Sequence, residues 1–124
     1  MIRILVLTFS IFGLSTTAQA FIASNGLLVE DAAGGDFRVP YRGLSAASDF
    51  WCAAGDYVVR DLGLPPDTRV FRTSSPPRRG GDGMTFSLSP SNAKKSGLGL
   101  FSNSRGLTAA HARQLCNDRR NILD

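Results

Sequence analysis

The sequence predicts a single small α+β domain, in which a mostly antiparallel sheet packs on a long central helix and a disulfide ties a C-terminal helix to it. Three observations predict this fold. Short runs of alternating apolar and polar residues are typical of half-buried strands, and one longer segment carries apolar residues at helical spacing. The only two cysteines, Cys52 and Cys116, fall in the two predicted helices.

Two N-terminal strands are predicted at 26–29 and 37–41, separated by a glycine-containing turn. In the second strand, apolar residues alternate with Arg38 and Pro40. Because proline cannot donate a hydrogen bond to a strand ladder, we expect this strand at an edge of the sheet. Alternation predicts a further antiparallel pair of strands, and one glycine-rich segment is an additional candidate; these segments are 69–73, 84–88 and 97–101.

Helix patterns predict a long central helix and a shorter C-terminal helix. The central helix is expected from Ala46 to Leu62, with Ser45 as its N-cap, and Gly63 follows its last residue. The C-terminal helix is expected from Ala109 to Asp118, with Thr108 as its N-cap. Both helices carry an apolar stripe, so we expect both to pack on the core.

The first 20 residues have the order of a secretory signal peptide. Arg3 precedes an apolar run from Ile4 to Leu14, and the segment closes on Ala18-Gln19-Ala20. The run is shorter than the roughly 20 residues that span a membrane. We expect cleavage after Ala20, which leaves residues 21–124 as one periplasmic or secreted domain without a transmembrane segment.

Both cysteines lie in the part of the chain expected to be exported, where thiols meet an oxidising compartment. We therefore predict a structural disulfide between Cys52 and Cys116, which closes a loop of about 65 residues and stabilises the fold by roughly 4 kcal/mol. The alternatives are a pair of free thiols or a redox couple. The lack of C-x-x-C spacing argues against a redox couple.

Two polar loops carry the candidate binding residues. The segment 74–83 is rich in proline and glycine, so we expect it to be mobile and solvated, and the segment 89–96 is also polar. Long loops on a disulfide-bonded scaffold often hold binding residues. If both loops project from the same end of the sheet, their basic side chains form one surface; these are Arg78, Arg79, Lys94 and Lys95.

The partner expected for this surface is an anionic component of the cell envelope, such as a lipid phosphate or an acidic polysaccharide, or another protein. Nucleic acid is not expected, because no aromatic residues interleave with these charges. The formal net charge of +4 also falls to about +3 without Arg3. The alternative interpretation is that the basic pairs are only solvated loop residues.

No residue pattern predicts catalysis, so we expect a noncatalytic protein with no cofactor and no metal. His111 is the only histidine, which excludes the usual histidine-rich zinc and copper sites. We expect it to have a local role in the first turn of its helix. Asp49 and Asp56 share one helix face, as an acid–base pair would, but we interpret them as solvated side chains.

Two other classes of function remain open. A small periplasmic hydrolase would place His111 beside Asp49 or Asp56 in a concave pocket. A subunit of an envelope assembly would expose an apolar patch around residues such as Phe71 or Phe101. The shape of the folded domain distinguishes these classes from a binding module.

The stretch from Ser48 to Val58, followed by Arg69-Val70-Phe71-Arg72, resembles small uncharacterised exported proteins of alphaproteobacteria. The resemblance covers roughly the middle of the chain. It implies a periplasmic or secreted setting in a Gram-negative bacterium, and it implies no activity, cofactor or site residue.

Overall fold

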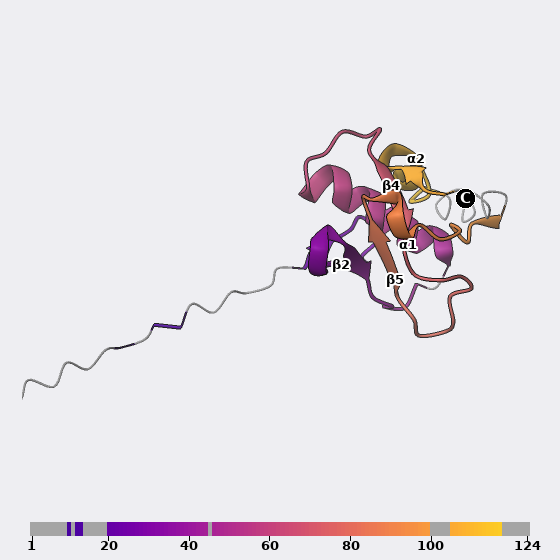
Figure 1. Ribbon diagram of the computed structural model, residues 1–124. Coiled ribbons are helices and arrows are strands. Elements are labelled where there is room, and N and C mark those ends of the chain that lie inside the picture. Colours follow the sequence, from indigo (N-terminus) through magenta and orange to yellow (C-terminus); the bar gives the residue numbers. More distant parts are fainter. Residues whose placement is uncertain (1–9, 11, 14–19, 45, 100–104, 118–124) are drawn as a thin grey trace, which may run out of the picture.

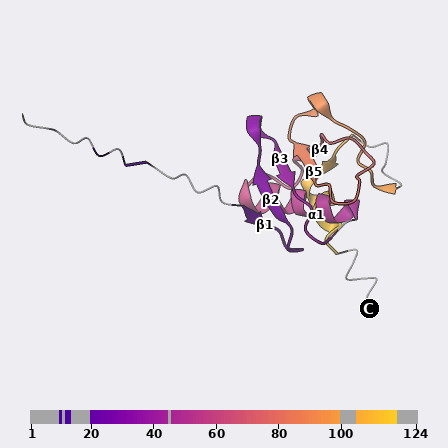
Figure 2. The same ribbon diagram turned by 90° about the horizontal axis from the view of Figure 1, so that it is seen from below.

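The computed structural model describes residues 10, 12–13, 20–44, 46–99 and 105–117. Within these residues, six short strands form one antiparallel sheet in the order β1-β2-β3-β5-β4-β6. Figure 2 shows β1, β2 and β3 on the left and β5 and β4 to their right. The strands are β1 (Phe21–Ile22), β2 (Leu28–Asp31), β3 (Phe37–Val39), β4 (Arg69–Arg72), β5 (Met84–Ser87) and β6 (Leu107–Thr108).

The central helix packs on the sheet but is shorter than the sequence predicts. Helix α1 covers Ala47–Asp56, and the chain continues as a π-helical turn, η2, over Tyr57–Asp61. The change of helix type coincides with Tyr57, whose hydroxyl donates a hydrogen bond to the carboxylate of Asp31 on β2. Local spacing does not encode a contact between residues so far apart in the chain. The expectation of one long α-helix over 46–62 was therefore wrong in length.

The start of α1 depends on a buried carboxylate. The N-cap is Ala46, and its backbone amide donates a hydrogen bond to Oδ2 of Asp49 at 3.2 Å. An acidic side chain in the first turn also interacts favourably with the positive end of the helix dipole. Asp49 is only 5% exposed, so its interpretation as a solvated side chain was wrong. The predicted cap, Ser45, lies outside the described residues.

The core lies between α1 and the middle of the sheet. Trp51 of α1 is fully buried and meets Phe86 of β5 edge-on, with ring centroids 5.0 Å apart. Phe86 stands opposite Phe37 in the register of β3 and β5, and these two rings stack at 5.7 Å. Tyr57 also packs against Phe37, with ring centroids 4.8 Å apart. Aromatic packing therefore joins the helix to the two central strands.

Strands β4 and β5 form the antiparallel pair that the sequence predicts. The prediction that the strand over 37–41 lies at a sheet edge was wrong, because β3 lies between β2 and β5. Pro40 follows Val39, the last residue of β3, so its missing amide hydrogen interrupts no ladder. The candidate strand at 97–101 is not formed over 97–99, and the rest of it lies outside the described residues.

The predicted disulfide between Cys52 and Cys116 is present and joins α1 to the chain just after α2. Helix α2 covers Ala109–Gln114, and the predicted cap, Thr108, accepts a hydrogen bond from the His111 amide at 3.2 Å. The helix ends before Cys116, which was expected inside it, because the last amides bond to carbonyls three residues back and close a tight turn. In Figure 1, α2 lies on the β4 side of the domain, directly after β6.

The two helices approach each other closely at a glycine. A Cβ atom on Gly55 would lie 2.7 Å from the Ala112 Cβ and 2.8 Å from the Ala109 carbonyl oxygen. Both distances are shorter than van der Waals contact, so this position of α1 has no room for a side chain. The disulfide and this glycine together hold α2 against α1.

Candidate functional site

Arg72, the last residue of β4, is a buried cation. It is 1% exposed, and its guanidinium donates hydrogen bonds to Ser74 Oγ at 3.3 Å, to the Ser75 carbonyl at 3.5 Å and to the Ser96 carbonyl at 3.3 Å. All three acceptors are neutral, and no acidic side chain of the described residues forms a salt bridge with it. Burial, followed by the nearby charge of Arg78, lowers the pKa of the Arg72 guanidinium. An anion at this position would stabilise the charged form.

The segment 94–97 packs closely against Arg72. The backbone amide of Lys94 donates a hydrogen bond to the Arg72 carbonyl at 2.7 Å. Gly97 has a φ of +76°, and a Cβ atom there would collide with the Arg72 Nη1. Glycine meets both requirements, because it tolerates positive φ and leaves the space free.

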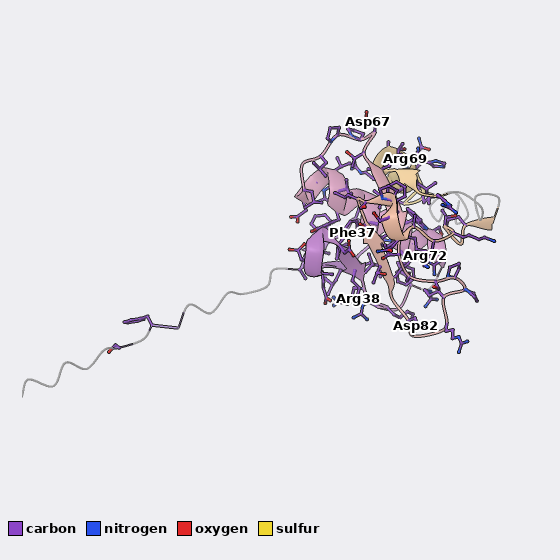
Figure 3. The ribbon with its side chains drawn as sticks, in the orientation of Figure 1. Phe37, Arg38, Asp67, Arg69, Arg72 and Asp82 are labelled. Atoms are coloured by element: carbon purple, nitrogen blue, oxygen red, sulfur yellow. A yellow bond between two sulfur atoms is a disulfide. The ribbon has the colours of Figure 1, made fainter. Side chains whose placement is uncertain are left out.

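Arg72 lines a cavity of about 360 Å³ together with Arg38 and Arg78, and we call this cavity the arginine pocket. Arg38 comes from β3, where it stands opposite Thr85 of β5. Asp82 is the single acidic residue among those that line the pocket in the described structure, so three arginines and one aspartate give a formal charge of +2. Figure 3 shows Arg38, Arg72 and Asp82 in the same lower half of the domain. The remaining lining residues are Ser74, Ser75, Gly83 and Thr85.

Arg78 lines the pocket and packs against the domain. Its guanidinium lies over the ring of Phe50, 4.9 Å from the centroid, and 5.8 Å from the centroid of Tyr41. It also donates hydrogen bonds to the carbonyls of Arg79 and Asp82, at 3.0 and 2.8 Å. The loop over 74–83 was expected to be mobile and solvated. At Arg78 the side chain is half-buried, because it packs on these aromatic rings and bonds to these carbonyls.

Of the four predicted binding residues, Arg78 lines the arginine pocket. Arg79, Lys94 and Lys95 are exposed and are not among its lining residues. Both polar loops nevertheless meet at Arg72, which donates hydrogen bonds to a residue of each. The single basic surface that the sequence suggested, formed by all four side chains, stays a prediction.

Sequence reasoning missed Arg38 and Arg72 as candidate site residues. Arg72 lies two residues after the fully buried Val70, so strand alternation places both on the same face. A cation on the apolar face of a predicted strand was the available signal. Arg38 gave no such signal, since an arginine that alternates with apolar residues is ordinary on the solvent face of a strand.

A second cavity, of about 490 Å³, lies beside Asp56 at the end of α1. Asp56 is 1% exposed and accepts hydrogen bonds from the Ser24 amide at 2.9 Å and from Arg60 Nη1 at 2.6 Å. Arg113 Nε of α2 lies 3.4 Å from its other oxygen. The interpretation of Asp56 as solvated was wrong, because its carboxylate joins the N-terminal turn and both helices. These donors occupy the oxygens that an acid–base catalyst would use.

The arrangement expected for a small hydrolase is not formed around this second cavity. His111 is not among the residues that line the cavity with Asp56. Asp49 points to the start of α1, where it accepts a hydrogen bond from Ala46. Nothing in the described geometry therefore supports an acid–base pair at either aspartate.

Among the residues that the structure describes, no group of three acidic, histidine or cysteine side chains gathers as metal ligands. In the same part of the chain, no helix has the length and apolar character needed to cross a membrane. The apolar patch expected for a subunit of an envelope assembly would lie around Phe71 and Phe101. Phe71 is only 8% exposed, and Phe101 lies outside the described residues.

Comparisons with protein-family models, curated proteins and solved structures give no match.

Proposed function

We propose that this protein is a noncatalytic binding module that holds an anionic group of a cell-envelope component in the arginine pocket. The observation that carries the proposal is the buried guanidinium of Arg72, which has only neutral acceptors among the described residues. A buried cation without an opposite charge is costly, and a bound anion would remove that cost. Arg38 and Arg78 add positive charge to the same cavity.

The proposal includes export to the periplasm or beyond. Two observations support it: the signal-peptide pattern that ends at Ala20, and the disulfide between Cys52 and Cys116, which is typical of oxidising compartments. Strand β1 begins at Phe21, the residue after the expected cleavage point. Mass spectrometry of the protein recovered from a periplasmic extract tests this part. A chain that still carries residues 1–20 would contradict it.

The binding part is tested on immobilised heparin, a sulfated polysaccharide that serves as a defined polyanion. Arg38→Gln and Arg79→Gln each remove one positive charge, but only Arg38 lines the arginine pocket. We expect Arg38→Gln to elute at clearly lower salt than the native protein, and Arg79→Gln to elute close to it. Equal shifts for the two variants would mean that net charge alone governs binding, and would overturn the proposal.

A further inference from the structure

We propose that the anion held in the arginine pocket is a terminal phosphate monoester, rather than a carboxylate. This inference rests on the proposed function and specifies its ligand. It follows from the kind, number and charge of the groups that line the pocket.

Arg72 and Ser74, which both line the arginine pocket, have hydrogen-bond donors beyond those used within the described residues. A guanidinium carries five N–H donors, and Arg72 uses three of them in hydrogen bonds to the described residues. Ser74 Oγ accepts hydrogen bonds both from Arg72 Nε and from the Thr85 amide, so the hydroxyl hydrogen of Ser74 remains to be donated. These donors suit a group that accepts several hydrogen bonds.

Arg38 adds a second guanidinium to the same cavity. It is exposed on β3, and no residue that the structure describes forms a salt bridge with it. The planar fork of a guanidinium matches the paired oxygens of a phosphate, and arginine is the residue that proteins most often use for this purpose. Arg38 and Arg72 line the same cavity from opposite faces of the sheet, since the register places Arg38 beside Thr85 and Arg72 beside Phe86.

Charge and size favour phosphate over carboxylate. The lining side chains carry a formal charge of +2, and a phosphate monoester carries a charge of about −2 at neutral pH, whereas a carboxylate carries one negative charge. A phosphate monoester also offers three terminal oxygens to the donors, and a carboxylate offers two. The cavity of about 360 Å³ is many times the volume of one water molecule, so there is room for the organic group beyond the phosphate.

Binding is measured by calorimetry with glycerol 3-phosphate, sulfate and acetate at constant ionic strength. We expect glycerol 3-phosphate to bind more tightly than acetate, and its affinity to fall below about pH 6, where the phosphate gains a proton. Arg38→Gln is expected to weaken binding by about tenfold or more, while Arg79→Gln leaves it close to native. Acetate binding as tightly as glycerol 3-phosphate, or equal losses in the two variants, would overturn the inference.

The source of the phosphate is tested with vesicles. Sedimentation with phosphatidic acid vesicles that depends on Arg38 but not on Arg79 would identify a lipid headgroup as the source. Binding of glycerol 3-phosphate without vesicle binding would identify a soluble ligand instead. If the heparin experiment distinguishes the two variants but glycerol 3-phosphate does not bind, this inference fails and the proposed function stands. If neither probe distinguishes the variants, both fail.

Discussion

Trp51 and Arg72 donate hydrogen bonds to the same acceptor, the carbonyl oxygen of Ser96, at 3.0 and 3.3 Å. Trp51 belongs to the buried face of α1, whereas Arg72 lines the arginine pocket. The shared carbonyl therefore connects the rigid core to the candidate site. A cation held in this way is preorganised, so the proposed anion would order few additional groups on binding.

Gly97→Ala is expected to lower the free energy of unfolding by about 1–3 kcal/mol and to weaken anion binding. Alanine disfavours the φ of +76° that Gly97 adopts, and its methyl group would collide with the Arg72 Nη1. Urea unfolding measures the first effect and calorimetry the second. Gly26→Ala is the control, because Gly26 has a φ of +84° but open space around it. If the control weakened anion binding equally, the contact with Arg72 would not be the cause.

Cys116→Ser is expected to lower the free energy of unfolding by roughly 4 kcal/mol, because the crosslink restricts the unfolded chain. Cys116 is the better position for the test, since the fully buried Cys52 would place a serine hydroxyl in the core. Thermal unfolding with and without a reducing agent provides the comparison. We expect reductant to lower the Tm of the native protein and to leave that of the variant unchanged. A native Tm that does not respond to complete reduction would contradict the prediction.

Asp56→Asn is expected to destabilise the protein by about 1–3 kcal/mol, because this carboxylate accepts hydrogen bonds from Ser24 and Arg60 and forms an ion pair with Arg113. Arg113→Gln should cost less, about 0–1 kcal/mol, since the Arg113 side chain is 40% exposed and water can solvate it. Urea unfolding of both variants measures the difference. Equal costs would show that Asp56 contributes only through its pair with Arg113.

The stability should decrease in alkaline solution because of Tyr57. Burial, and then its hydrogen bond to Asp31, raise the pKa of the Tyr57 hydroxyl above the ordinary tyrosine value of about 10. The folded protein keeps a proton that the unfolded chain loses above that pH. Stability from this group is therefore complete below about pH 10 and falls as the pH rises further, by up to about 1.4 kcal/mol per unit.

Tyr57→Phe provides the matched control for this pH dependence, since it keeps the ring and removes the hydroxyl. Urea unfolding between about pH 9 and pH 11 should show a steeper loss of stability in the native protein than in the variant. The same slope in both proteins would mean that another group titrates in this range.

Several parts of the fold could be predicted because they depend on neighbouring residues. Alternation over 69–73 and 84–88 indicated β4 and β5, and the threonine before the last helix indicated its cap at Thr108. The disulfide was predictable for a different reason, since Cys52 and Cys116 have no other cysteine with which to pair.

The length of the central helix and the place of β3 could not be predicted in the same way. The π-helical turn occurs where Tyr57 reaches Asp31 across the fold, and the position of β3 depends on its pairing with β5. The prediction of an edge strand from Pro40 was wrong, because Pro40 lies just beyond Val39, the last residue of β3.

The sequence alone determined the local elements and the crosslink, since spacing, capping and cysteine number are properties of short segments or of composition. Only the tertiary structure decided which charged side chains are buried. Asp56 resembles an ordinary polar residue of a helix and Arg72 lies in a predicted strand, yet both are 1% exposed. Their burial results from packing between segments far apart in sequence, and burial is what makes the charge of Arg72 costly without an opposite charge beside it.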